Sequence, residues 1–351
     1  MNDYYAATAY RSDRLPNQPS SRERPWLKRF SCIRLPWGGT DDVAPEAFFT
    51  KPSPESLRFW ENAKKEKEEQ LAAGTYVPAP YEHVEFHDRH DHERFRFALW
   101  SKRSHFWLYL LGGGRALFYL FTVVSVLNYF STLTVTRKSW KEHLYSSIPL
   151  DAVLIGVPLL CWALGALVFY KFPRLWVKPS RGPLWELNRR TGLVTLFDYD
   201  NNGEYKKHGT IGEITAPFYE FDAYLVNFPD RQGLMMYKLV LGHRYRDILI
   251  DFGALVSIGP AHQLPCALWD FIQNYMDTRH PLPELPRYEQ YRHLDPASAD
   301  YDRLYARPPR LWIDMDDERF KACVQDMFMR IDNITTLQRP NRMARHVEYV
   351  D

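Results

Sequence analysis

Histidines and acidic residues crowd into the stretch EHVEFHDRHDHERF, which precedes the most apolar part of the chain. Imidazole and carboxylate groups at this spacing could converge on a transition-metal ion, and the candidate ligands are His87, His90 and His92. The spacing matches no metal-ligand pattern such as HExxH. We therefore interpret the stretch as a polar, pH-sensitive linker, and we predict no metal and no other cofactor.

No other group of residues has the spacing of a catalytic centre. The sequence contains no GxSxG nucleophile motif, no phosphate-binding loop and no dinucleotide-binding glycine pattern. Its four cysteines are far apart and form no CxxC pair, which argues against a zinc site or a disulfide framework. We therefore predict that the protein is not an enzyme.

Four cations occupy two predicted turns in the C-terminal half of the chain: Arg189, Arg190, Lys206 and Lys207. If these turns face a membrane, each cation adds about 1 kcal/mol of attraction to anionic lipid head groups. The alternative is that turn cations serve only solubility. Over the whole chain 45 Lys and Arg stand against 43 Asp and Glu, so no general basic field indicates a nucleic acid partner.

Two apolar stretches are long enough to cross a membrane as helices. Residues 117–135 and residues 153–170 contain no charged side chain, and a helix of about 20 residues spans the hydrocarbon of a bilayer. The short polar segment between them predicts an antiparallel hairpin. Eleven Lys and Arg flank the hairpin, against three in its connection, which predicts that both termini lie in the cytoplasm.

An aromatic segment, HFWLYLLGGG, comes just before the first of these stretches. Trp107 and Tyr109 are predicted to anchor it at head-group depth, because amphipathic rings favour the membrane interface. The glycine run at 112–114 has low helix propensity, so we expect a helix to be interrupted there. Residues 106–172 are therefore predicted to be the membrane part, made of an interfacial segment and the hairpin.

The residues ahead of the membrane part divide into two predicted segments. Residues 1–52 are rich in Pro, Ser and Arg, a composition that rarely forms a core by itself, and we expect them to be largely irregular. Residues 53–105 are expected to form a cytoplasmic helix and the histidine-rich linker. Ser53 has the position of an N-cap, and Gly74 that of a helix end.

After the membrane part, residues 180–280 show the two-residue periodicity of β-strands. About seven short strands are separated by turns, and an apolar stripe through Leu264, Leu268 and Phe271 predicts a helix after the last one. The fold class is therefore α+β, and the domain resembles a pleckstrin-homology-like barrel capped by a helix. A β-sandwich with a trailing helix is the rival fold. Residues 281–351 are expected to form a proline-rich extension, a short helix and a mobile basic tail.

Several segments together resemble a family of proteobacterial inner-membrane proteins that are often encoded near type VI secretion effectors. They are the proline-rich N-terminal part, the two-span hairpin, LWELNRRTGLVTLFDYD, ALWDFIQNYMD and HPLPELP. The resemblance covers about residues 100–295. It implies a multi-pass protein of the bacterial inner membrane with an accessory role in interbacterial competition, as an immunity protein that neutralises a cognate toxin. It assigns no binding residues.

The first functional hypothesis is therefore a non-enzymatic, membrane-tethered module that contacts membrane lipid and binds a protein partner, a cognate toxin. One alternative is a toxic membrane effector whose hairpin forms a pore or perturbs the envelope. Another is a lipid-sensing membrane scaffold. The sequence does not indicate the oligomeric state.

Overall fold

The computed structural model describes residues 4–22, 31–78, 82, 84, 86–135, 139–177, 180–199, 211–256 and 258–350. Contacts between residues divide the chain into two units. The globular unit consists of Met1–Tyr76, Asp88–Phe97 and Pro183–Asp351, and the hairpin unit consists of Val77–His87 and Ala98–Gly182. This division differs from the predicted one, because residues from both sides of the membrane part fold together.

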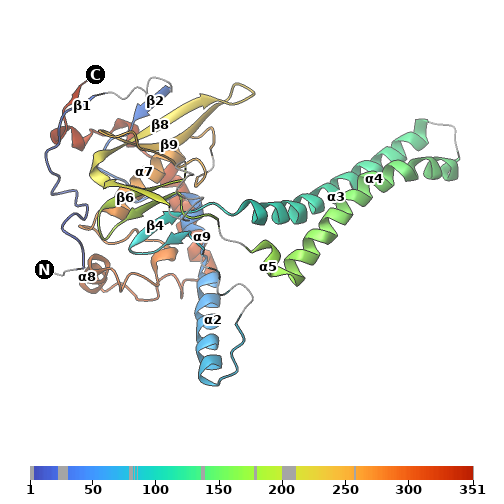
Figure 1. The fold of residues 1–351 in the computed structure, drawn as a ribbon, viewed down its shortest axis with the longest axis horizontal. Helices are drawn as coiled ribbons and strands as arrows, with labels where there is room; N and C mark the ends of the chain where they lie inside the picture. Colours follow the sequence, from blue (N-terminus) through green and yellow to red (C-terminus); the bar gives the residue numbers. More distant parts are fainter. Residues whose placement is uncertain are drawn as a thin grey trace. The chain divides into compact units, whose positions relative to one another are not determined.

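Two antiparallel sheets form the centre of the globular unit (Figure 1). Their strands are β2 (Ser31–Arg34), β3 (Arg89–His90), β4 (Arg94–Phe97), β5 (Trp185–Asn188), β6 (Leu193–Asp198), β7 (Gly212–Pro217), β8 (Phe221–Pro229), β9 (Met235–His243) and β10 (Leu249–Asp251). Among the described residues, one sheet has the order β3-β4-β5-β6-β7 and the other the order β10-β9-β8-β2. The predicted mixture of helices and antiparallel sheets is therefore confirmed.

The first strand pair of the C-terminal half is the one that the sequence predicts. β5 and β6 are antiparallel, with Asn188 opposite Leu193. Gly192 closes the turn at a φ of +69°, which glycine adopts at no steric cost. A Cβ on Gly192 would lie 2.4 Å from the carbonyl oxygen of Thr8. The turn therefore needs glycine both for its backbone conformation and for close contact with the N-terminal segment.

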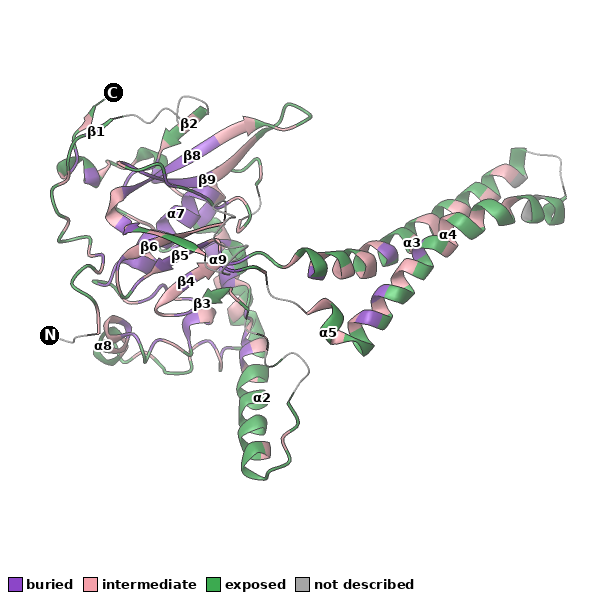
Figure 2. Ribbon diagram, in the orientation of Figure 1, coloured by how far each residue is buried: buried purple, intermediate pink, exposed green. Residues whose placement is uncertain are grey.

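Helix α7 (Gln263–Met276) supplies much of the core of the globular unit. Trp269, Phe271 and Tyr275 on this helix are completely buried. The ring of Phe271 lies 6.1 Å from that of Phe95 on β4, and α7 also contacts β8 and β9. One helix thus fills the space against both sheets, and burial in Figure 2 concentrates on these elements.

The N-terminal segment is part of this core, which corrects the expectation that its composition could not support one. β2 pairs with β8, with Ile33 opposite Leu225. Trp37 is 1% exposed, and its ring lies 4.8 Å from that of Trp269. The segment has few regular elements, but its aromatic side chains are buried against apolar residues that the C-terminal half provides.

Helix α1 (Glu46–Phe49) and helix α2 (Pro54–Ala72) follow this segment. The predicted start of α2 is confirmed, because the Ser53 hydroxyl accepts a hydrogen bond from the Ser56 N–H at 3.3 Å. Figure 1 shows α2 extending away from the sheets. Leu57 in its first turn packs on Trp312 and Met315, while most of the charged remainder of the helix is exposed.

The C-terminal tail also belongs to the core, so the expected mobile tail is wrong. After helices α8 (Pro296–Leu304) and α9 (Asp317–Asp332), strand β11 (Tyr349–Val350) pairs with β1 (Ser21–Arg22). Met343 is completely buried. Arg339 also fixes the tail, because its guanidinium forms ion pairs with Asp41 and Asp270. Composition alone does not reveal these partners.

The hairpin unit contains two long antiparallel helices, α3 (Lys102–Val135) and α4 (Trp140–Lys171), followed by the short helix α5 (Pro173–Trp176). Both long helices exceed the predicted spans. α3 continues through the glycine run at 112–114, so the expected interruption is wrong. The predicted polar connection is also shorter than expected, because α4 already begins at Trp140.

The hairpin unit is inserted between two neighbouring strands of one sheet. β4 comes before α3 in the chain, β5 comes after α5, and the two strands pair with Phe97 opposite Trp185. The Leu184 N–H donates to the Phe97 carbonyl oxygen at 2.8 Å. The chain therefore leaves the globular unit and returns to it at adjacent positions.

Candidate functional site

The hairpin is the most unusual surface of the protein. Among the described residues, α3 and α4 are the two helices long and apolar enough to cross a membrane. Apolar side chains such as Leu120, Val123, Val157 and Leu160 are largely exposed along them. Figure 2 colours most of both helices as exposed or intermediate. Exposed apolar residues along a helix pair are typical of helices that contact lipid or another apolar surface.

Glycines set the distance between the two helices. A Cβ on Gly114 would lie 2.6 Å from the backbone nitrogen of Trp162, and a Cβ on Gly165 would lie 2.7 Å from that of Leu111. Small residues at such positions let helix backbones approach closely, as in membrane helix pairs. This close contact explains why α3 runs through its glycines: packing against α4 outweighs their low helix propensity.

Aromatic side chains gather where the chain enters and leaves the hairpin. We name Trp100, Trp107, Tyr109, Tyr170 and Trp176 the aromatic collar. Within it, Trp100 and Trp176 stack with ring centroids 6.5 Å apart, and the Tyr109 side chain is 73% exposed. The Ser104 hydroxyl donates to the Trp176 carbonyl oxygen at 2.6 Å, which ties α3 to α5.

Cations surround the collar. Lys102 and Arg103 begin α3, Lys171 ends α4, and Arg174 lies in α5. Amphipathic rings and cations together are typical of a membrane–water interface. The predicted anchors Trp107 and Tyr109 thus lie on α3 within such a group, although not on a separate interfacial segment.

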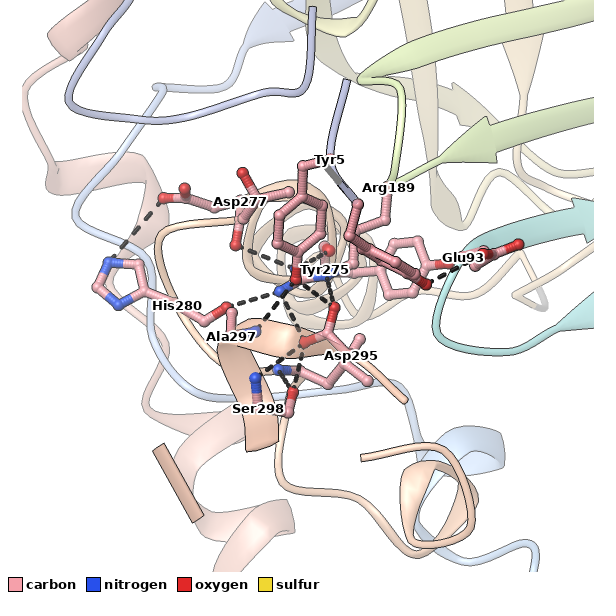
Figure 3. Close-up of polar contacts among 12 residues, drawn as sticks. Tyr5, Glu93, Arg189, Tyr275, Asp277, His280, Asp295, Ala297 and Ser298 are labelled. Atoms are coloured by element: carbon pink, nitrogen blue, oxygen red, sulfur yellow. Dashed lines mark hydrogen bonds and ion pairs between the residues drawn. The ribbon is translucent and has the colours of Figure 1, made fainter. Parts of the chain in front are cut away.

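Arg189, which we predicted to contact lipid, is completely buried, and Figure 3 shows its polar contacts. Its Nε atom donates to an Asp295 carboxylate oxygen at 3.1 Å, and its other nitrogens donate to the carbonyl oxygens of Tyr275, Asp277 and His280. The prediction is wrong because the Arg189 side chain does not reach solvent: acidic and carbonyl oxygens from a distant part of the chain surround the guanidinium.

The carboxylate partner of Arg189 is itself fully satisfied. Tyr5 and Ser298 donate their hydroxyl groups to Asp295. Burial alone would raise the pKa of the Asp295 carboxyl, but the Arg189 guanidinium and these hydrogen bonds hold that pKa below its usual value. The pair is therefore a structural link between the N-terminal segment, the β5–β6 turn and the start of α8.

Arg190 is the neighbour of Arg189 but has a different environment. Its side chain is 48% exposed and forms an ion pair of 3.5 Å with Glu93. Its Nε donates to the Tyr4 carbonyl oxygen at 2.8 Å. The other two predicted lipid contacts, Lys206 and Lys207, lie outside the described residues. Of the two predicted lipid contacts that the structure describes, only Arg190 is exposed.

The histidines of the candidate metal site have different environments. His90 and His92 belong to the globular unit, and His87 is assigned to the hairpin unit. The ring of His92 stacks on that of Tyr291 at 5.6 Å. In the part of the chain that the structure describes, no three His, Cys, Asp or Glu residues are arranged to hold a metal ion.

His90 is partly buried and packs against residues of the core. Its ring stacks on that of Phe95 with centroids 4.2 Å apart, and its Nε2 atom is hydrogen-bonded to the Tyr288 hydroxyl at 2.5 Å. Burial, and next the Arg287 cation, hold the His90 pKa well below its usual value. The side chain is therefore neutral at pH 7 and functions in packing.

A pocket of about 470 Å³, which the sequence analysis did not predict, opens beside α9. Trp312 is fixed in its wall, because its indole N–H donates to Glu284 at 2.7 Å. Its remaining lining is mostly apolar and includes Phe49, Phe320 and Val324. Phe320 lies edge-on to Trp312 with ring centroids 6.2 Å apart.

Pockets of this size and character accept a small apolar ligand or the side chains of a protein partner. The helical periodicity of α9 could have revealed the apolar face of this helix. It could not have revealed that a loop outside α9 completes the pocket.

Comparisons with protein-family models, with curated proteins and with solved structures returned no match. The function is therefore inferred from the geometry of the chain itself.

Proposed function

We propose that this protein is a non-enzymatic, membrane-tethered protein-binding module of the bacterial inner membrane. The observation that carries the proposal is the insertion of an apolar helical hairpin between two paired strands of a globular unit. Such an arrangement needs a lipid environment for the hairpin and leaves the globular unit in water. It supports a protein whose task depends on being held at a membrane.

The strand pairing supports the proposed topology independently of charge. Residues before and after the hairpin form one sheet through β4 and β5, and a sheet cannot continue across a bilayer. Both flanks must therefore lie on the same side of the membrane, with an even number of crossings. The excess of Lys and Arg around the hairpin supports the cytoplasm as that side.

The globular unit is best described as pleckstrin-homology-like. The meander β4-β5-β6-β7 forms one sheet, β8-β9-β10 continues in the other, and α7 follows the last strand and packs against both. The hairpin then occupies the connection between the first two strands of this meander. β2 and β3 add a strand to the edge of each sheet.

The pocket beside α9 is the surface that best fits a protein partner. It combines fixed aromatic walls with charged residues at its edge, including Arg319 and Arg330, and aromatic and arginine side chains are enriched at the centres of protein interfaces. We infer that an apolar side chain of the partner enters this pocket. In the role that the family resemblance implies, the partner is a toxin that acts at the inner membrane.

Co-production with the effector encoded beside the gene tests the proposal. The protein should rescue growth, and Ala322→Arg, at an exposed position that lines the pocket, should abolish rescue. Gln325→Arg, at an exposed α9 position outside the lining, is the matched control and should rescue fully. Failure of the unaltered protein to rescue would contradict the immunity role. Depolarisation of cells by this protein alone would instead support a pore-forming effector.

A further inference from the structure

The register of the hairpin fixes which parts of its two helices can share one bilayer. Gly114 lies opposite Cys161 and Trp162, and Gly165 lies opposite Leu111. A step of three residues along α3 thus matches a step of three or four in the opposite direction along α4. Continuing this register places Ser125 opposite Asp151.

The two charge-free stretches of the sequence are therefore staggered. In this register residues 117–135 lie opposite about 141–159, a part of α4 that contains Lys141, Glu142 and Asp151. A bilayer centred on 117–135 would take these three charges into hydrocarbon, where charged side chains are costly. Residues 117–135, the charge-free stretch of α3, are therefore not the best membrane segment of the hairpin.

We propose that the bilayer embeds residues 106–125 of α3 and residues 151–170 of α4, and that the distal ends of both helices project beyond it on the far side. Each segment contains about 20 residues, or about 30 Å of helix, which matches the hydrocarbon thickness. This inference rests on the proposed insertion of the hairpin into a membrane.

Characteristic side chains mark the two ends of the embedded segments. The aromatic collar and its cations lie at one end of the embedded segments. Asp151 lies at the other end, and the side chains of an α-helix lean toward its N-terminus. Asp151 on α4 therefore leans toward the tip of the hairpin, away from the hydrocarbon.

Arg115 is the single charge strictly inside the embedded segments. Its side chain leans toward the start of α3, and thus toward the collar. Its guanidinium carbon lies 5.9 Å from the ring centroid of Tyr119 and 6.0 Å from that of Trp162. The ring faces provide a partner for the cation where water is scarce, and the long side chain brings the charge closer to the interface.

The projecting tip mixes polar and exposed apolar side chains, a composition that suits the head-group layer next to the hydrocarbon. Val126–Val135 of α3 and Trp140–Leu150 of α4 include Asn128, Ser131 and Glu142 beside exposed apolar residues. The far side of the membrane would therefore meet the ends of two helices rather than a minimal turn.

Single cysteines test this placement in a full chain without its four native cysteines, in which Cys32, Cys161, Cys266 and Cys323 are all replaced by alanine. Phe130→Cys and Leu120→Cys replace side chains of similar exposure, 62% and 55%, on the same helix. A membrane-impermeant maleimide is applied to intact cells with a permeabilised outer membrane, and to opened membranes without detergent. We expect Phe130→Cys to react in both preparations, and Leu120→Cys to react roughly tenfold more slowly or less, because the reactive thiolate is disfavoured in hydrocarbon.

Protection of Phe130→Cys in opened membranes, at a rate equal to that of Leu120→Cys, would overturn the placement and favour residues 117–135 as the span. Equal and rapid reaction of both positions in opened membranes would show that the hairpin is not inserted at all. That outcome contradicts the proposed membrane tether itself, and fractionation of the protein away from membranes would confirm it. If Phe130→Cys reacts in opened membranes but not in intact cells, residue 130 lies outside the hydrocarbon on the cytoplasmic side. That result would support the embedded segments but contradict the far-side location of the tip.

Discussion

Arg189 and Arg190 are adjacent residues of one turn with opposite roles. Arg189 is completely buried and paired with Asp295, whereas Arg190 is half-exposed beside Glu93. Removing one member of a buried pair leaves the other charge uncompensated, whereas an exposed pair contributes little. The position of a cation in a turn therefore does not decide its role; its partners do.

We expect Arg189→Met to lower the free energy of unfolding by about 3–5 kcal/mol, because Asp295 would remain buried without its cation. Arg190→Met is the matched control and should cost about 0–1 kcal/mol. Thermal unfolding of the full chain in detergent, followed by intrinsic fluorescence, measures both. Equal stability of the two variants would show that the buried pair does not stabilise the fold.

His90 makes the stability of the globular unit depend on pH. Its pKa is lowered in the folded state, so the unfolded chain binds a proton near pH 6.5 that the folded chain does not bind. The contribution of the neutral His90 ring to the free energy of unfolding is thus complete above about pH 6.5. It is lost as the pH falls below that value. The loss should reach about 1.4 kcal/mol per pH unit.

Denaturant unfolding at pH 7.5, 6.5 and 5.5 tests this dependence, with His90→Phe as the comparison. Phenylalanine keeps an aromatic ring beside Phe95 but cannot take up a proton. The variant should lose part of the pH dependence, while contributions of the other histidines remain the same. Identical slopes for both proteins would rule out His90 as the cause.

These residue roles could not be predicted from the sequence. The partners of His90 and Arg189 lie far away in the chain, at Tyr288 and Asp295. Local composition indicates which groups can ionise. Only long-range contacts decide whether water reaches them.

At the scale of elements, the hairpin depends on two glycines with different surroundings. A Cβ on Gly114 would meet the backbone of α4, whereas nothing lies within 4 Å of a Cβ on Gly113. Alanine raises helix propensity equally at both positions, by about 1 kcal/mol. The difference between the two variants therefore isolates helix–helix contact.

We expect Gly114→Ala to destabilise the hairpin by about 1–3 kcal/mol, because α3 and α4 must move apart. Gly113→Ala should be neutral or stabilising. Unfolding of the full chain by SDS titration, followed by circular dichroism, measures both effects. A Gly114→Ala variant as stable as Gly113→Ala would mean that the helices do not pack at the distance described above.

The regular elements were largely predictable because their signals are local. The cap at Ser53, the turn at Gly192 and the apolar stripe of α7 are all patterns within a few residues. The course of α3 through its glycines was not predictable, because its cause lies in a second helix. Likewise, β4 is only four residues long, and its partner β5 follows the entire hairpin.

At the scale of the whole molecule, the hairpin unit is an insertion into a globular unit that closes without it. The Phe97 carbonyl and the Leu184 N–H are hydrogen-bonded, so a short turn can join β4 directly to β5. We expect replacement of residues 98–182 by an Asn-Gly turn to give a water-soluble protein that keeps its helix and strand content.

Fractionation, gel filtration and circular dichroism of this variant check the expectation. Production of the same variant with Arg189→Met provides a destabilised control. If the turn variant aggregates while the full chain is folded in detergent, the globular unit depends on the hairpin and the two units are not independent.

The most direct test of the account is proteolysis from outside the inner membrane. The full chain carries different tags at its two ends, and trypsin is applied to cells with a permeabilised outer membrane, where the sequence Arg137-Lys138 in the hairpin connection offers a cleavage site. We predict two fragments, each with an intact terminal tag, that are recovered together from detergent because they share the sheet of β4 and β5. Loss of either terminal tag to external trypsin would show that the two flanks of the hairpin lie on opposite sides of the membrane, which one continuous sheet cannot do.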